Sequence, residues 1–376
     1  MDYKYSAEDG WLNFEGELGL IFGIMALWAL SLPSITTLPM MPKAIGGMRW
    51  NQGTRGQCSV PHSCQACYPF FVAFFSEGKD TLVIRRTSKR MVKLGAHMSI
   101  AGGYYKAIEA AAELKMDVCQ LFTKNNNQWA AKPISDAEVE HFRTTLKSTK
   151  VTNPLSHASY LINLASPKDD LWEKSIDAIV IEWQRAEQLG LDGVVMHPGA
   201  FVDSSEEQGM QRIVDAIHRI YRATKPKQAW LLLENTAGQG SCLGWSMEQM
   251  GWLIERTGEA LQVGMCLDTC HVHAAGYDFS TADGFKAWEK ESKKLGLLDA
   301  IRALHLNDSK KGCGSRVDRH EHIGHGTIGR EGFVRVLKHR VLKKLPMYLE
   351  TDKGDTDDGE PWDAVNLRVL RELADS

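Results

Sequence analysis

Eight short apolar runs recur between Leu94 and Glu350, and each ends on a polar residue of a kind that can hold a metal ion or a phosphate. The segments between the runs have the apolar spacing of amphipathic helices. A strand-length run followed by a helix, repeated eight times, predicts an α/β fold of the closed (β/α)8 type, the TIM barrel. The terminal residues are, in chain order, His97, Lys124, His157, His197, Glu234, Asp268, His305 and Glu350.

Helix start signals between the runs support this pattern. Ser135 with Glu138, and Ser246 with Gln249, have the spacing of a capping box just ahead of apolar residues. The stretch 171–189 carries apolar and aromatic residues at helical spacing, which is typical of a face packed against a core. We therefore expect these stripes to serve packing and not binding.

The length of the chain exceeds what one barrel needs. A barrel of this type takes about 250 residues, whereas the chain has 376 and the pattern begins only at Val92. We predict two parts: residues 1–90, an extension that is disordered or a mis-assigned start, and residues 91–376, a single catalytic barrel domain. On this hypothesis Met91 is the true initiator, and an intact mass equal to all 376 residues would refute it.

The extension shows no membrane or export signal. Its apolar run, Leu18 to Leu32, is shorter than the roughly 20 residues that span a bilayer, and mostly acidic residues precede it, whereas a secretory leader begins with positive charge. Cys64 and Cys67 form a C-x-x-C without a second pair, so no metal is expected there. Eight cysteines in the whole chain are too few for a disulfide scaffold. A cytoplasmic protein without membrane association is predicted.

Charge alone does not identify the partner. The net charge is −3, whereas a simple nucleic-acid-binding domain is usually basic. However, clustered carboxylates are what metal ligation requires, and each bound divalent ion would add two positive charges where a polyanion could dock.

The polar ends of the runs predict a metal centre, because the carboxyl ends of the strands of such a barrel meet at one rim. Histidine and carboxylate side chains suit divalent ions of the zinc class. Any one of them could be a hydrogen-bonded polar cap, but ligand types end six consecutive strands. Three sets are expected: Glu234, Asp268, His305 and Glu350; His157 and His197 with Glu234 as a bridge; and His271, Asp318 and His320. Spacing alone leaves the number of ions open.

Residues near these sets have less specific roles. His97 is expected to hydrogen-bond within the rim. Cys266 shares the strand parity of Asp268 and should pack inside the barrel, whereas Cys270 has the opposite parity and is not expected to be a ligand. Three further histidines either orient the ligands or lie on the surface: His273, His322 and His325.

Two connections are candidates for substrate contact. The segment 307–332 is much longer than the usual two to six residues of a βα loop, and long loops on this face are usually functional. The segment 123–133 carries Lys124, three asparagines and Trp129. An ordinary polar loop is the alternative interpretation of both.

Several motifs together resemble the endonuclease IV family of apurinic/apyrimidinic DNA endonucleases. The resemblance begins at Val92, covers about the last three quarters of the chain, and includes nothing before Met91. The matching motifs are Gly95-Ala-His97-Met-Ser99, Leu121-Phe-Thr-Lys124-Asn125, Ser156-His157-Ala-Ser-Tyr160, His197-Pro-Gly199, Leu233-Glu234-Asn235, Leu267-Asp268-Thr-Cys-His271, His305-Leu-Asn-Asp308, Ser315-Arg316-Val-Asp318-Arg319-His320 and Leu349-Glu350-Thr351.

The resemblance implies a function and a set of ligands. It implies three Zn²⁺ ions per chain, with Mn²⁺ as an alternative ion at some positions, held by the three sets named above. The implied reaction is hydrolysis of the phosphodiester on the 5′ side of an abasic site in double-stranded DNA, leaving a 3′-hydroxyl and a 5′-deoxyribose phosphate. Glu234 as the bridge and Glu350, orienting the attacking water, are the implied catalytic residues, and the chain is expected to act as a monomer.

DNA contacts are expected from the two loops and one strand end. An abasic nucleotide has lost its pairing and stacking, so it costs less to extrude than an intact one. The sequence departs from the family pattern at Asn127, where some members have an arginine wedge. The expected contacts are Tyr160 and the Lys124 to Trp129 loop, including Asn127, for insertion, and Lys310, Lys311, Arg316 and Arg319 for phosphates.

Two other classes of function remain open at this point. A metal-dependent sugar isomerase or epimerase on the same barrel would need only the set with Glu234, Asp268, His305 and Glu350. A non-catalytic protein that binds damaged DNA would need no complete ligand set. Incision of a duplex with one abasic analogue, with and without a chelator, distinguishes the three.

Overall fold

A computed structural model describes residues 71–74, 83–86 and 92–376 of the chain. Strands β1 (Phe71–Phe74) and β2 (Val83–Arg86) form an antiparallel pair in a unit of their own. The expectations about the run from Leu18 to Leu32, about Cys64 and Cys67, and about Met91 concern residues outside the described ranges. They remain predictions, as does the division at residue 90.

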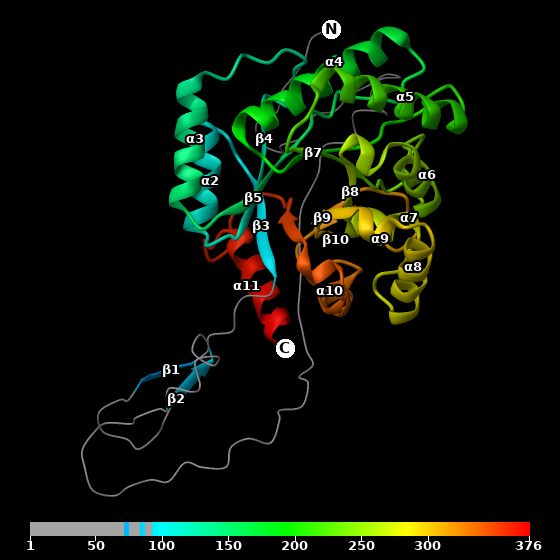
Figure 1. The fold of residues 1–376 in the computed structure, drawn as a ribbon. Helices are drawn as coiled ribbons and strands as arrows, with labels where there is room; N and C mark the ends of the chain where they lie inside the picture. Colours follow the sequence, from blue (N-terminus) through cyan, green and yellow to red (C-terminus); the bar gives the residue numbers. More distant parts are fainter. Residues whose placement is uncertain (1–70, 75–82, 87–91) are drawn as a thin grey trace, which may run out of the picture. The chain divides into compact units, whose positions relative to one another are not determined.

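The main unit is a closed barrel of eight parallel strands surrounded by helices (Figure 1). The order around the barrel follows the chain, from β3 to β9, and β12 closes the ring between β9 and β3. This confirms the predicted TIM barrel. The strands are β3 (Lys93–Met98), β4 (Val118–Phe122), β5 (Thr152–His157), β6 (Gly193–Met196), β7 (Trp230–Glu234), β8 (Val263–Asp268), β9 (Ile301–His305) and β12 (Pro346–Leu349).

The helices pack their apolar faces on the outside of the strands. They are α2 (Tyr104–Glu113), α3 (Asp136–Ser148), α4 (Asp169–Leu189), α5 (Glu206–Thr224), α6 (Met247–Thr257), α7 (Thr269–Ala275), α8 (Ala282–Lys294), α9 (Leu297–Ala300), α10 (Gly329–Lys338) and α11 (Trp362–Asp375), with 3₁₀ turns at Glu259–Leu261 and Leu342–Lys344. In α4 the predicted stripe is buried at Ile176, Ile179 and Trp183, so its packing role is confirmed.

The two predicted capping boxes differ in outcome. Ser135 and Glu138 make both reciprocal bonds at the start of α3. Ser246 caps α6 by accepting a hydrogen bond from the backbone N–H of Gln249, but the Gln249 side chain accepts from the backbone N–H groups of Gly244 and Trp245 instead. The preceding turn therefore takes the bond that the sequence assigned to the helix.

The interior of the barrel is built in layers, and these position the rim. Seven strands each contribute one buried side chain to an inner apolar cluster: Val118, Leu155, Val195, Leu232, Cys266, Ala303 and Tyr348. On β3 the corresponding residue is Gly95, where an added Cβ would lie 1.7 Å from the carbonyl oxygen of Val118. Only glycine fits there. The layer is a packed floor beneath the carboxyl ends of the strands.

The long connection after β9 is an ordered structure and not an open loop. It contains a short antiparallel pair, β10 (Asp308–Ser309) and β11 (His320–Glu321). The buried Asp308 carboxylate accepts hydrogen bonds from the backbone N–H groups of Gly324, Gly326 and Ile328 at 2.9–3.1 Å. The connection ends earlier than expected, because α10 begins at Gly329 and includes Gly332.

Within the described ranges, no helix has the length and apolar character needed to cross a membrane.

Candidate metal centre

A ring of polar side chains lies two residues beyond the inner apolar layer on every strand of the barrel. Because side chains alternate between the two faces of a strand, this spacing turns them toward the same interior as the apolar layer. The ring is buried except at His97 and His197, which are partly exposed. Its members are His97, Gln120, His157, His197, Glu234, Asp268, His305 and Glu350.

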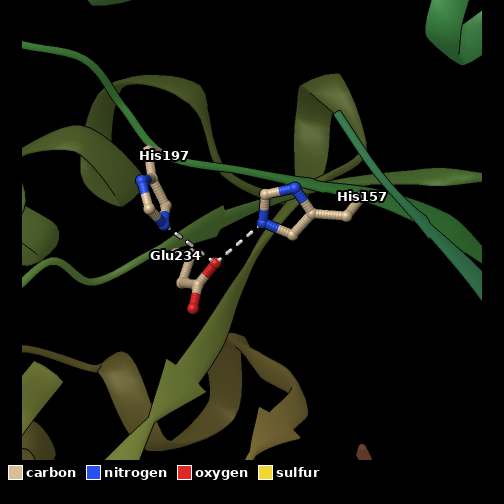
Figure 2. Close-up of side chains that lie close together, drawn as sticks. All are labelled: His157, His197 and Glu234. Atoms are coloured by element: carbon tan, nitrogen blue, oxygen red, sulfur yellow. Dashed lines mark hydrogen bonds and ion pairs between the residues drawn. The ribbon is translucent and has the colours of Figure 1, made fainter. Parts of the chain in front are cut away.

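The first donor group joins β5, β6 and β7 (Figure 2). His157 Nε2 and His197 Nε2 lie 3.3 and 3.4 Å from Glu234 Oε2. The other ring nitrogen of His157, Nδ1, lies 2.8 Å from the carbonyl oxygen of Ala158. Since a carbonyl can only accept, Nδ1 carries the proton and the Nε2 lone pair faces Glu234.

The second group uses the other oxygen of the same carboxylate. Glu234 Oε1 lies 2.8 Å from His305 Nδ1, and Glu350 Oε2 lies 3.4 Å from that nitrogen. Glu234 therefore stands between two donor groups and presents one oxygen to each.

Asp268, expected in this second set, lies close to the third as well. Its carboxylate accepts hydrogen bonds from the backbone N–H of His271 at 2.7 Å and from the Asn307 amide. It also forms a donor group with Cys270 and His320.

The third group combines helix α7 with the hairpin after β9. His271 Nε2 and His320 Nε2 each lie 3.1 Å from an oxygen of Asp318. His271 Nδ1 donates to the carbonyl oxygen of Asn235 at 2.8 Å, so Nε2 is the nitrogen that faces Asp318. The structure thus brings together all nine residues that the sequence singled out.

The electrostatics of the rim fit a bound cation. Burial and the neighbouring carboxylates raise the pKa of both Glu234 and Glu350, and burial lowers the pKa of His157 to about 4. Burial lowers the pKa of His271, but Asp268 and Asp318 outweigh it and raise the value to about 9. In the described part of the chain Glu350 Oε2 is buried without a hydrogen bond. Crowded carboxylates beside imidazoles form a donor set that a divalent ion of the zinc class would stabilise.

Gln120 is a rim residue that the sequence reasoning missed. It is fully buried; its Oε1 lies 2.8 Å from His305 Nε2, and its Nε2 donates to Glu350 Oε1. The amide therefore orients two candidate ligands at once, and it directs the His305 Nδ1 lone pair toward Glu234. Strand parity would have identified it, because Gln120 follows Val118 by two residues.

Lys124 requires a correction, because the end of the second run is not where the rim lies. Its side chain is buried, with Nζ 3.5 Å from Glu182 Oε1 and 2.6 Å from the carbonyl oxygen of Gln128. The ammonium group holds its own loop against α4 and is paired inside the protein in this structure. Trp129 in the same loop packs partly against the core.

The other predicted DNA contacts lie at or near the surface. Tyr160 is half-buried, with its ring 5.9 Å from that of His157, and Asn127 is exposed. Arg316 is exposed, and its guanidinium group lies 4.1 Å from the centre of the Trp245 ring. Arg319 is half-buried and donates to the carbonyl oxygen of Asp318 at 2.7 Å.

Several of the less specific expectations can be compared directly with the structure. His97 Nδ1 lies 3.4 Å from Glu350 Oε1, as expected of a rim group, and Cys266 packs in the inner layer. Strand parity does not apply to Cys270, because α7 begins at Thr269; its thiol lies within 4.8 Å of donor atoms of Asp268 and His320, and the expectation that it is not a ligand remains a prediction. His322 stacks on Trp362 at 3.8 Å.

The fold and the rim define a TIM barrel with potential metal-binding groups at its rim, and the comparisons with known proteins agree on the fold. A family model described as "Xylose isomerase-like TIM barrel" matches residues 108–373. Within that class the chain belongs to the endonuclease IV family. "Probable endonuclease 4" of Chloroflexus aurantiacus is 44% identical over 283 residues, which is 75% of this chain and 98% of the relative. The protein of the same name from Geobacter sulfurreducens is 43% identical over 280 residues, 74% of this chain and 94% of the relative.

Solved structures give the same picture. Endonuclease IV from Thermus thermophilus is 36% identical with a TM-score of 0.66, covering 75% of this chain and 98% of that one. A D-tagatose 3-epimerase-like protein is 17% identical with a TM-score of 0.57, covering 75% and 96% of the two chains. At that identity the second similarity shows the fold alone, so it does not favour a sugar epimerase.

Proposed function

We propose that the chain is a zinc-dependent endonuclease that hydrolyses the phosphodiester on the 5′ side of an abasic site in double-stranded DNA. The products would be a 3′-hydroxyl and a 5′-deoxyribose phosphate. The observation that carries the proposal is the position of Glu234, whose two oxygens face two separate donor groups. Together with a third group on α7 and the hairpin, this supports a multi-ion hydrolytic centre. A sugar isomerase would need only one of the groups.

The proposed ions are three Zn²⁺, with Mn²⁺ as an alternative at some positions. The first would be held by His157, His197 and Glu234, the second by Glu234, Asp268, His305 and Glu350, and the third by His271, Asp318 and His320. Asp268 stays in the second set because it is the next negative charge after Glu350 that raises the pKa of Glu234.

The protein's own residues have distinct tasks in this proposal. When bound, the ions supply activation of water and neutralise charge on the phosphodiester. Glu234 holds the first two donor groups at a fixed separation. Glu350 accepts from Gln120 at one oxygen, and its other oxygen, Oε2, makes no hydrogen bond in the described ranges, so it is available to orient the attacking water.

Selection of the abasic nucleotide would depend on the surface around the rim. Tyr160 lies beside His157 and would insert into the DNA at the abasic site, and Asn127 is an exposed residue of the adjacent loop. Arg316 and Arg319 would contact phosphates from the hairpin that also carries Asp318 and His320. We leave Lys124 out of the DNA contacts because its ammonium group is paired inside the protein.

The proposal also covers the oligomeric state and the cellular location of the protein. We expect a monomer that acts in the cytoplasm, and the free cysteines among the described residues fit a reducing compartment: Cys119, Cys242, Cys266, Cys270 and Cys313.

The test is incision of a duplex that carries a single abasic analogue, beside the same duplex with all bases intact. Zinc-loaded protein should cut only the first, on the 5′ side of the analogue, and a chelator should stop the reaction. A DNA polymerase should extend the new end if it is a 3′-hydroxyl. No incision by metal-loaded protein would reject the proposal, and binding without incision would favour a non-catalytic damage-binding protein.

A further inference from the structure

A second cluster of possible metal donors lies outside the nine residues discussed so far. It consists of His273 on α7, Asp278 in the connection between α7 and α8, and Cys313 in the loop between β10 and β11. One donor atom from each residue lies within 4.8 Å of the other two. His273 Nδ1 and Asp278 Oδ1 are 3.7 Å apart.

The hydrogen bonds of Thr327 determine which nitrogen of His273 carries the proton. The Thr327 hydroxyl has a single hydrogen. Its oxygen, Oγ1, lies 2.7 Å from the carbonyl oxygen of Lys311 and 3.1 Å from that of Ser309. Both carbonyls can only accept, so the hydroxyl donates to one of them. It must therefore accept from His273 Nε2, 3.3 Å away. Nε2 carries the proton, and Nδ1 presents a lone pair.

That lone pair is buried and points into the cluster. His273 is 1% exposed, and its Nδ1 has no hydrogen bond anywhere in the described part of the chain. Buried polar atoms normally have a partner, so an orphaned one calls for an explanation such as an ion. The arrangement is also the usual one for a metal-bound histidine, whose second nitrogen donates to an oxygen.

The other two donors are held in place by their surroundings. Asp278 Oδ1 accepts from the backbone N–H of Ser280 at 3.0 Å and from its hydroxyl at 2.5 Å, which orients the carboxylate. The residue after Cys313, Gly314, donates its backbone N–H to the carbonyl oxygen of His273 at 3.1 Å. Cys313 is exposed, so the cluster opens to solvent on one side.

We propose that His273, Asp278 and Cys313 bind one further divalent ion of the zinc class. Ligand distances of about 2.0–2.2 Å for nitrogen and oxygen in a tetrahedral site separate neighbouring donors by roughly 3.3–3.6 Å, so His273 Nδ1 and Asp278 Oδ1, 3.7 Å apart, need to approach only slightly. A small rotation of the exposed Cys313 side chain closes the third position. The Cys313 thiol gives up its proton to solvent and binds as thiolate, and water fills the open fourth position.

This ion would act on the loop and not on the reaction. It would tie the connection between α7 and α8 to the loop that leads to Asp318 and His320. The site does not depend on the proposed DNA chemistry. It also differs in kind from the rim, because its sulfur donor is exposed and none of the nine predicted ligands is a cysteine.

The test compares metal content in the full-length protein and in matched variants. After loading with Zn²⁺ and removal of free ion, Cys313→Ser and His273→Phe should each hold one ion fewer per chain than the wild type. Cys242→Ser serves as the control thiol and should hold the wild-type number. Because Cys58, Cys64 and Cys67 remain in every variant, the difference reports on Cys313 itself.

Cobalt gives a second readout that activity does not influence. Co²⁺-loaded wild type should show sulfur-to-cobalt charge-transfer absorption that Cys313→Ser loses, and Cys270→Ser should keep it. Zinc should also slow trypsin cleavage after Lys310, Lys311 and Arg316 more in the wild type than in Cys313→Ser. Equal ion counts and equal absorption in wild type and Cys313→Ser would overturn the proposal. Loss in Cys313→Ser but not in His273→Phe would overturn the role of Nδ1.

Discussion

Replacing Gln120 with leucine should weaken metal binding at the second donor group without destroying the barrel. Leucine keeps most of the volume, so the packing below it is retained, but the hydrogen bonds to His305 and Glu350 are lost. His305 Nε2–H then lacks its buried acceptor, which costs about 1–3 kcal/mol in the free energy of unfolding of the metal-free protein. Loss of an orienting partner usually lowers metal affinity by about 10–100-fold, or about 1.4–2.7 kcal/mol.

The assay is competition with a chelator of known affinity, followed by incision measured at saturating metal. Gln249→Leu is the matched control. Gln249 on α6 is likewise a buried glutamine, but its side chain accepts hydrogen bonds from backbone N–H groups and not from candidate ligands. Both variants should lose stability, and only Gln120→Leu should release an ion more readily. If the two variants hold their ions equally well, Gln120 serves packing alone and the reasoning is refuted.

Three further outcomes follow from the described contacts. Glu234→Gln should lose the shared carboxylate, so incision should fall below detection while circular dichroism shows a folded barrel; a near wild-type rate would exclude the bridging role. In metal-free protein, burial lowers the His157 pKa to about 4 from 6.5, so the unfolded chain takes up the proton first as pH falls. The contribution of neutral His157 to the free energy of unfolding is therefore complete above pH 6.5 and is lost toward pH 4. The difference in unfolding free energy between wild type and His157→Gln should shrink over that range. A constant difference would contradict the lowered pKa. Lys124→Met should lower the unfolding free energy by about 3 kcal/mol, because the buried Glu182 loses its ion-pair partner and keeps the hydrogen bond from the Thr123 hydroxyl, and DNA affinity should change little. Arg316→Ala should instead weaken binding of the abasic duplex and lower the slope of log affinity against log salt concentration by about one. The reverse pattern would restore Lys124 as the DNA contact.

The barrel could be predicted because its evidence is local and repeated. Each run has strand length, each intervening segment has helical spacing, and one misread element would not change the count. The candidate ligands followed from the same pattern, since a residue such as Glu234 or His305 ends its strand in both the sequence and the structure.

The errors arose where the end of an apolar run was taken for the end of a strand. Lys124 ends its run, but β4 ends at Phe122 and the inward-facing position is Gln120. Counting two residues from Val118 would have given the right side chain.

The cluster of His273 and Cys313 lay beyond sequence reasoning for another reason. Forty residues separate the two, and the bond from Gly314 to His273 that brings them together belongs to an irregular loop. Its geometry has no periodic signal.

The packed floor below the rim has a consequence for when the protein can hold metal. Each polar side chain of the ring follows the floor residue of its own strand by two positions, and this spacing turns it inward. A slip of one residue in any strand would turn its donor outward. Only the second donor group includes Glu350, which follows β12, so an ion retained by that group would report that the last strand has joined the first.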